Sequence, residues 1–512
     1  MIMIIERSSE WQEDFLNRLD KDEQWNSWTL YKRNYEIIKS NLITEFSGLQ
    51  CVKYLPKLTP LLHQLEAATT VIESMNGKAI LADEVGLGKT IEAGLILKEY
   101  LIRGLVKKAL ILAPASLINQ WVEELNLKFH IPAMAFKKKY PIEHYDIIVM
   151  SMDTAKKSPH REVIYAQDYD IIIIDEAHKL KNHKTQIYQF VQSLKKKFCL
   201  LLTATPIQND VFELFYLVSL LKPGHLGNYE TFQSAFSASK HNLEHDEFLK
   251  ELVNQVMVRN RREDTSIEWT NRRVHTIPIQ FTKEEREAYD LLVMLKDVSP
   301  VFSSSMSLIT LQKEMCSSKE ATCLTLSKML ESCVQQEEID YVQALLEKIM
   351  SLEINSKAER TAEIIAQVND KVIIFTEYRA TQIYIQWYLH TKGITSVLFN
   401  GKYNKSKRDY MKHLFKEQAQ VLIATEAGGE GINLQFCHHV INYDLPWNPM
   451  KLEQRIGRVH RLGQEEDVHI YNLAIENTIE DDILALLHTK IDVFEKVVGD
   501  LDAILTNLKK SI

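Results

Sequence analysis

The sequence has no apolar run long enough to cross a membrane. Its longest apolar stretches, such as the one that ends with Ile171–Ile174, are far shorter than the roughly 20 residues that a bilayer requires. The first five residues are apolar, but no basic residue precedes them and charged residues follow at once, which is unlike a secretory signal. We therefore expect a cytoplasmic protein.

Paired cysteines and an excess of positive charge are also missing. The six cysteines form no Cys-x-x-Cys pair, so the sequence supports neither a zinc ribbon nor a disulfide framework. Sixty-one Lys and Arg residues stand against 69 Asp and Glu residues, a net charge of −8. The acidic excess lies in residues 276–350 and from 465 onward, whereas 58–275 and 351–464 are neutral to basic. A polyanion would therefore have to bind to a local patch.

The composition is that of a folded protein with several domains. The 512 residues are 45% hydrophobic and 25% charged, and about 150 residues per domain suggests three or four domains. No internal repeat is visible. Two segments alternate short β-branched runs with helical patterns, which is typical of parallel sheets flanked by helices. The sequence therefore predicts an α/β fold with two such lobes, each with a parallel central sheet.

We place the boundaries of these regions by changes in pattern. We expect a helical N-terminal extension at residues 1–57, a first α/β lobe at 58–275, a helical insertion at 276–350, a second α/β lobe at 351–475 and C-terminal bracing helices at 476–512. The strands that we predict are Ala79–Ala82, Ala109–Ala113, Asp146–Met150, Ile171–Asp175, Phe198–Thr203, Val372–Thr376, Thr395–Phe399, Val421–Ala424 and His439–Tyr443.

A glycine loop follows the first predicted strand and precedes a helical run. It reads Gly86-Leu87-Gly88-Lys89-Thr90. Backbone N–H groups of such a loop cradle phosphates, Lys89 can reach the terminal phosphates, and Thr90 can bind Mg²⁺. The strict Walker pattern would have a glycine where this chain has Asp83, which we include among the nucleotide-binding candidates with the loop residues.

Two adjacent acids, Asp175 and Glu176, end the most apolar predicted strand. Parallel sheets bind ligands at the carboxyl ends of their strands. We expect Asp175 to hold Mg²⁺ and Glu176 to orient and deprotonate the attacking water. No Asn-Lys-x-Asp sequence follows a predicted strand, so ATP is favoured over GTP.

The third element lies in the second lobe. On a helix, Gln454, Arg458 and Arg461 would share one face and Arg455 would point away. A guanidinium group suits a γ-phosphate, and an arginine finger accelerates hydrolysis by about 10³ to 10⁵. These residues predict that the second lobe completes the nucleotide site, so that ATP binding would close a cleft between the lobes.

These motifs resemble those of the SWI/SNF-type ATPases of helicase superfamily two, most closely the bacterial branch that includes the RNA-polymerase-recycling ATPase. The resemblance covers about Leu58–Asn472 and is carried by Leu81–Thr90, Asp175–His178, Thr203–Thr205 and Gln454–Gln464. It implies two tandem RecA-like P-loop lobes. It also implies a translocase that acts on double-stranded DNA.

The resemblance also implies roles for further residues. Gln64 would read adenine, and Thr203 and Thr205 would couple hydrolysis to lobe movement. Ser116 and Gln120 would face the DNA backbone.

Other matches to the family lie nearer the second lobe. Thr425–Asn433 would touch both ATP and DNA, with Gly431 near the nucleotide and Thr425 and Asn433 near the DNA. Arg261 matches an arginine element after the first lobe. Trp447 matches a tryptophan near the DNA, and packing in a core is its alternative role.

We therefore expect an ATP hydrolase with ATP and Mg²⁺ as cofactors, working as a DNA-stimulated motor on double-stranded DNA. It would remodel or displace a DNA-bound protein, with RNA polymerase among the candidates, near the nucleoid of a prokaryotic cell. Two alternatives stay open: a strand-separating DNA or RNA helicase, and a nucleotide-gated scaffold that binds DNA without turning over ATP.

Overall fold

The computed structural model divides the chain into two compact units, Met1–Gly48 and Leu49–Ile512. It describes residues 17, 28, 31–35, 48–204, 206, 211–236, 243–265, 267–298, 305–333, 335–401, 403, 405–426 and 433–487. In the first unit, the described residues 31–35 are helical, and Tyr31 stacks on Trp28 at 5.2 Å between ring centroids. Among the described residues, no helix combines the length and the hydropathy that a bilayer span requires.

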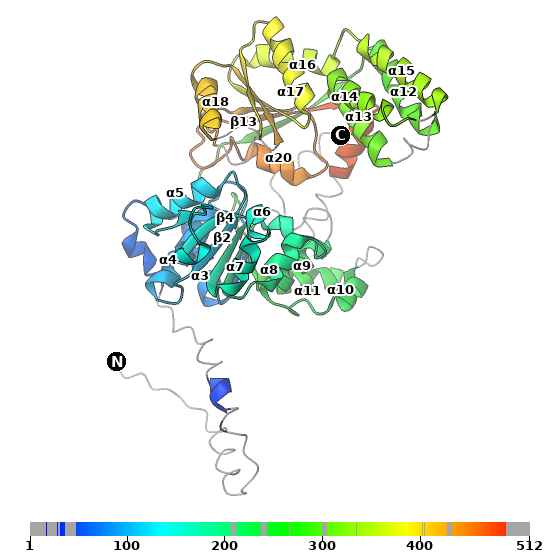
Figure 1. Cartoon of the computed structure of the whole chain (residues 1–512). Helices are drawn as coiled ribbons and strands as arrows, with labels where there is room; N and C mark the ends of the chain where they lie inside the picture. Colours follow the sequence, from blue (N-terminus) through cyan, green and yellow to red (C-terminus); the bar gives the residue numbers. More distant parts are fainter. Residues whose placement is uncertain are drawn as a thin grey trace. The chain divides into compact units, whose positions relative to one another are not determined.

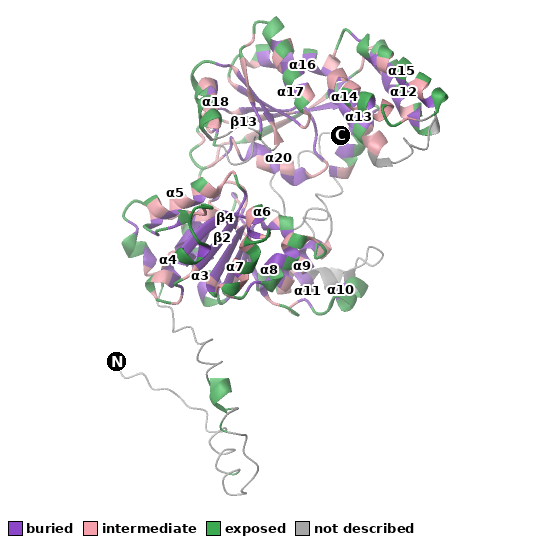
Figure 2. Cartoon of the chain, viewed as in Figure 1, coloured by how far each residue is buried: buried purple, intermediate pink, exposed green. Residues whose placement is uncertain are grey.

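A parallel sheet of seven described strands forms the first lobe of the second unit (Figure 1). The order is β3-β4-β2-β5-β6-β1-β7, and the strands are β1 (Lys78–Leu81), β2 (Ala109–Ala113), β3 (Met134–Ala135), β4 (Ile147–Ser151), β5 (Tyr169–Asp175), β6 (Lys196–Leu202) and β7 (Met257–Val258). Every residue of β2 and β4 is buried, as expected for strands covered on both faces (Figure 2).

Helices cover this sheet and connect its strands (Figure 1). They are η1 (Cys51–Tyr54), α3 (Leu62–Glu73), α4 (Lys89–Ile102), α5 (Ile118–Phe129), η2 (Ile142–His144), α6 (Met152–Ala155), α7 (His160–Ala166), η3 (Ala177–Leu180), α8 (Gln186–Ser193), α9 (Val211–Leu221), α10 (Tyr229–Phe236) and α11 (Leu243–Asn254). η1 is fastened to α4 because Glu99 accepts the backbone N–H of Gln50 at 3.1 Å and that of Cys51 at 2.7 Å. Part of the expected N-terminal extension therefore packs on the first lobe.

A second parallel sheet has six described strands in the order β10-β11-β9-β12-β13-β8. They are β8 (Arg272–Ile279), β9 (Val372–Thr376), β10 (Ser396–Phe399), β11 (Val421–Thr425), β12 (His439–Asn442) and β13 (Val468–Ile475). The boundary that we expected at His275 falls inside β8. Because β8 pairs with β13 along its whole length, it belongs to the second sheet rather than to the first lobe.

Helices of the expected insertion pack on this second sheet. α12 (Lys283–Val298), α13 (Ser305–Ser317), α14 (Lys319–Leu330) and α15 (Gln336–Met350) share a core with β9 and β11. The remaining helices with named bounds are α16 (Ser356–Val368), α17 (Arg379–Thr391), α18 (Lys405–Glu417) and α20 (Pro449–Ile456). Residues 479–487 are helical and bury Ile483 and Leu487. The insertion is thus a helical part of the second lobe.

Candidate active site

The glycine loop joins β1 to α4 through two left-handed residues. Gly86 and Gly88 both have φ of +99°, and Gly88 is the N-cap of α4. A Cβ atom on Gly88 would lie 2.6 Å from Nε2 of Gln64. Gly88 is therefore required by its backbone conformation, and the side chain of Gln64 lies close against it.

Gln64 holds the loop from α3. Its Nε2 donates to the carbonyl oxygen of Leu87 at 2.8 Å, and its Oε1 accepts the backbone N–H of Leu61 at 3.0 Å. Nε2 of His63 lies 3.1 Å from the same carbonyl oxygen. The structure thus shows Gln64 and Leu87 as parts of the loop's support, and the adenine contact of Gln64 stays a prediction.

The side chains of Lys89 and Asp83 have different hydrogen-bond partners. Nζ of Lys89 donates to the carbonyl oxygens of Asp83 at 2.6 Å and Glu84 at 3.2 Å, beside the loop. The Asp83 side chain is fully buried and accepts from the backbone N–H of Asn260 at 2.8 Å and from its Nδ2 at 3.0 Å. We expected Asp83 to contact the nucleotide, but its carboxylate faces Asn260, which supplies the hydrogen bonds that a buried carboxylate needs.

Asp175 ends β5 and Glu176 follows it, and the electrostatics of the two carboxylates differ. Burial and the neighbouring charge of Glu176 raise the pKa of Asp175, although Trp121 donates from Nε1 to Oδ2 of Asp175 at 2.9 Å. Burial acts to raise the pKa of Glu176 as well, but His178, whose Nδ1 lies 3.2 Å from Oε2, lowers it together with Arg458 and Lys89. Glu176 is therefore ionised at neutral pH and can accept a proton.

One cavity of about 260 Å³ brings most of the predicted site together. Its lining includes the glycine loop, both acids and residues of the second lobe. The predicted residues that line it are Gly86, Gly88, Lys89, Thr90, Gln120, Asp175, Glu176, Thr203, Gln454, Arg458 and Arg461. One cation and one acid that we did not single out, Lys128 and Glu124 of α5, complete the polar wall. The first and second lobes thus contribute to the same cavity.

The helix that we expected to carry Gln454, Arg458 and Arg461 ends early. α20 begins at Pro449 and ends at Ile456, so both arginines follow it in turns rather than on its face. Nε of Arg461 donates to the carbonyl oxygen of Gly457 at 2.7 Å, and this bond orients the arginine. Arg455 is buried and donates to Oδ1 of Asn442 at 3.1 Å, away from the cavity as predicted.

Arg262 joins the glycine loop to the segment that follows α20. It donates to the carbonyl oxygen of Val85 at 2.5 Å and to that of His460 at 3.1 Å, and its other terminal nitrogen lies 2.9 Å from Nδ1 of His460. We had singled out the neighbouring Arg261, which is half-exposed and pairs with Asp264 at 3.1 Å. Arg262 is therefore the arginine that bridges the two segments, and the DNA-contact or coupling role of Arg261 stays a prediction.

Gly457 allows a second close contact between the same segments. Its φ of −64° suits any residue, but a Cβ atom there would lie 2.2 Å from Cγ1 of Val85. The glycine is therefore required for space and not for its conformation. With Arg262, it makes the loop and the post-α20 segment one packed unit.

The remaining predicted residues that the structure describes lie outside the cavity lining. Ser116 is half-buried after β2, Thr425 ends β11, and Asn433 is exposed and donates from Nδ2 to Oε1 of Gln435 at 2.7 Å. Trp447 is partly buried against the core, with Nζ of Lys313 5.4 Å from its ring centroid, so it packs as its alternative role proposed. Thr205 and Gly431 lie outside the described residues.

Comparison with known proteins identifies the family of the chain. The model of the SNF2-related domain matches residues 63–339, and that of the helicase conserved C-terminal domain matches residues 356–463. YqhH of Bacillus subtilis, named as an ATP-dependent helicase, is 59% identical over 504 residues, which are 98% of this chain and 90% of YqhH.

More distant relatives agree with this family. The RNA polymerase-associated protein RapA of Proteus mirabilis is 27% identical over 88% of this chain, which spans about half (51%) of that relative's length. The helicase domain of Pyrococcus furiosus Hef shares the fold, with a TM-score of 0.53 and 17% identity over 83% of this chain and 97% of the other. The chain therefore belongs to the SNF2-related family of ATP-dependent helicases and is an ATP hydrolase.

Proposed function

We propose that the chain is a motor that moves along double-stranded DNA and uses ATP hydrolysis to displace or remodel a bound protein. The observation that carries this proposal is the single cavity lined by the glycine loop, by Asp175 and Glu176, and by Arg458 and Arg461. Groups of both lobes face one substrate-sized space. Hydrolysis in such a space changes the contacts between the lobes, which is what a motor requires.

Different residues of the first lobe would bind the phosphates, hold Mg²⁺ and act on the attacking water. Loop N–H groups and Lys89 would bind the phosphates, and Glu176 would take the proton of the attacking water. Thr90 and Asp175 offer the hard oxygen ligands that Mg²⁺ prefers, and a cation there would offset the cost of two adjacent, largely buried carboxylates. When bound, Mg²⁺ would neutralise charge on the phosphates.

The second lobe would act on the transition state. Arg458 and Arg461 share the cavity with Glu176, and the pKa of Arg461 is lowered to about 10 by burial and by the charge of Arg458. Two guanidinium groups that line one cavity repel each other, and the charge of Glu124 offsets part of the effect on Arg461. The terminal phosphate would relieve that repulsion, so ATP binding favours the arrangement that closes the site.

The target on DNA is proposed from the relatives. RapA proteins are named for their association with RNA polymerase, and this chain spans about half of their length. A protein bound to duplex DNA is therefore the proposed target, with RNA polymerase as the first candidate to test. Because YqhH is named a helicase, strand separation is the second candidate, and an unwinding assay with a labelled duplex separates the two.

The test of the catalytic assignment is the Glu176→Gln variant. Glutamine keeps the size of the side chain but cannot accept a proton, so ATP should bind while turnover falls at least a hundredfold. Glu123→Gln, an exposed residue of α5, is the matched control and should keep normal turnover. Near-normal turnover in Glu176→Gln would refute the role of Glu176.

A further inference from the structure

Two imidazoles and one carboxylate lie close together at the end of the second sheet where its parallel strands begin. The segments that follow the carboxyl ends of these strands lie at the opposite end of the sheet. His439 begins β12, and Asp370 lies two residues before β9. Because β12 and β9 are parallel neighbours in which His439 pairs with Val372, the two segments meet at one edge. Nothing in the proposed ATP reaction uses these residues.

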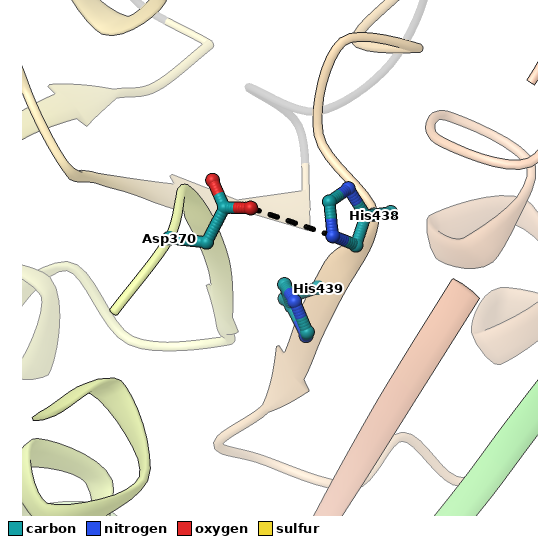
Figure 3. A group of neighbouring side chains, drawn as sticks. All are labelled: Asp370, His438 and His439. Carbon is teal, nitrogen blue, oxygen red and sulfur yellow. Dashed lines mark ion pairs between the residues drawn. The ribbon is translucent and has the colours of Figure 1, made fainter. Parts of the chain in front are cut away.

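Asp370, His438 and His439 face one another (Figure 3). Nε2 of His438 lies 3.4 Å from Oδ2 of Asp370, and one ligand atom from each of the three residues lies within 4.8 Å of the others. A tetrahedral zinc ion with bonds of about 2.0–2.1 Å holds its ligand atoms about 3.4 Å apart. The first pair already has this separation, and a side-chain adjustment of up to about 1.4 Å would bring the third ligand atom to the same separation.

His439 supplies an observation that is independent of the clustering. Its side chain is about nine-tenths buried, and its Nδ1 atom has no hydrogen-bond partner among the described residues. A buried imidazole nitrogen without a partner is costly, and a metal ion is one group that would satisfy it. Asp370 is half-exposed, so the cluster is open to ions from the solvent.

The backbone around the cluster is held in place by neighbouring groups. The buried thiol of Cys437 donates to the carbonyl oxygen of Lys371 at 3.0 Å, which ties the His438 segment to the Asp370 segment. Oδ1 of Asp370 accepts the backbone N–H of Lys371 at 2.5 Å, and this leaves Oδ2 toward His438. The ammonium group of Lys371 is bound to the carbonyl oxygens of Phe415 and Ala419. The ligands are therefore preorganised, with the nearest lysine engaged elsewhere.

We propose that Asp370, His438 and His439 bind a divalent transition-metal ion of the zinc class. Two imidazoles and one carboxylate suit zinc and similar ions, whereas Mg²⁺ prefers oxygen ligands alone. Three protein ligands leave one position for water. The ion would cross-link β12 to the segment before β9.

Zinc binding by the full-length chain tests this proposal. The protein is freed of metal with a chelator and titrated with Zn²⁺ alone in a calorimeter at pH 7.5. We use the Asp175→Asn background so that the nucleotide site does not contribute. We expect one saturable equivalent of Zn²⁺, and we expect the affinity to fall at least tenfold in Asp370→Asn and in His438→Ala. His413→Ala, an exposed histidine of α18, should bind like the parent.

Thermal unfolding gives a second readout. Saturating Zn²⁺ should raise the melting temperature of the parent but not that of Asp370→Asn, whose half-exposed side chain can change without unfolding the lobe. The proposal is overturned if the parent shows no saturable Zn²⁺ uptake, or if both ligand variants keep an affinity within twofold of the parent.

Discussion

At the residue scale, Arg458 and Glu176 come from distant parts of the sequence but line one cavity. Burial opposes ionisation of Glu176, yet His178, Arg458 and Lys89 lower its pKa. The positive charges therefore keep the Glu176 carboxylate ionised at neutral pH, and they also make it a weaker base. The same charges face the position where negative charge would develop on the phosphates.

For Arg458→Ala we expect ATP to bind with little change and hydrolysis to fall by about 10³ to 10⁵, because the first lobe holds ATP while the guanidinium acts on the transition state. Nucleotide affinity and single-turnover rates measure the two effects separately. Arg360→Ala, at a partly exposed arginine of α16, is the control. If ATP binding were lost while bound ATP was still hydrolysed at the normal rate, this role of Arg458 would be contradicted.

His460 makes stability depend on pH. Burial and the positive charge of Arg272 lower its pKa from 6.5 to about 3. Because the unfolded chain binds this proton more readily, the contribution of His460 is fully present above pH 6.5 and is lost as the pH falls toward 3. When the pH falls from 7.5 to 5.5, protonation of His460 in the unfolded chain should reduce the free energy of unfolding by about 1 kcal/mol.

His460→Gln removes this titration. Denaturant unfolding at both pH values should show a smaller loss of stability in His460→Gln than in the parent, whereas His413→Gln should follow the parent. An equal pH dependence in all three proteins would show that His460 is not the group responsible.

At the element scale, the sequence patterns located most central strands and the edge strand β10, but they missed the inner strand β13 and the short or edge strands β3, β7 and β8. Val372–Thr376 and Ala109–Ala113 are continuous apolar runs, and both are strands with the predicted bounds. β8 is an edge strand whose residues alternate between partly buried and exposed, and its Arg and His residues hid it from a search for apolar runs. β3 and β7 have only two residues each. Such elements depend on their partner strands rather than on their own pattern.

The turn after α20 provides a prediction about two elements in contact. In Gly457→Ala, the new methyl group would overlap Val85, and overpacking of this kind typically costs about 1–3 kcal/mol. We expect turnover to fall about 10- to 100-fold because the glycine loop and Arg458 would no longer be held in register. Steady-state ATPase assays measure the effect.

Val85→Ala should rescue the Gly457→Ala variant. Removing the methyl groups that the new Cβ atom would strike restores the space, so the double variant should recover most of the lost turnover. Additive losses in the double variant would mean that the contact between Gly457 and Val85 does not matter for catalysis.

At the scale of the whole molecule, the motifs predicted which residues line the cavity but not how the lobes are joined. Glycines, acids and arginines at fixed spacing indicate a phosphate-binding site, and 11 of the predicted residues line the cavity. Arg262 and Gly457 act through neighbours that are distant in sequence, so no local pattern reveals them. For the same reason Asn260, which fixes Asp83, could not be found from the sequence.

The charge distribution also changes meaning once the fold is known. The acidic excess after Gln464 lies entirely within residues 465–487, and residues 488–512 carry equal numbers of acidic and basic side chains. Glu480 pairs with the buried Lys357 at 2.5 Å, and Ile483 belongs to the core. Part of this acidic segment therefore belongs to the folded second lobe.

The central claim is that duplex DNA drives ATP hydrolysis in this cavity, and the most direct test compares ATPase rates with duplex DNA, single-stranded DNA and RNA at equal nucleotide concentration. We predict that duplex DNA raises the rate at least tenfold, that added salt reverses the increase because phosphate contacts release counterions, and that Glu176→Gln abolishes it. Strong stimulation by single-stranded nucleic acid with no response to duplex DNA would contradict the account.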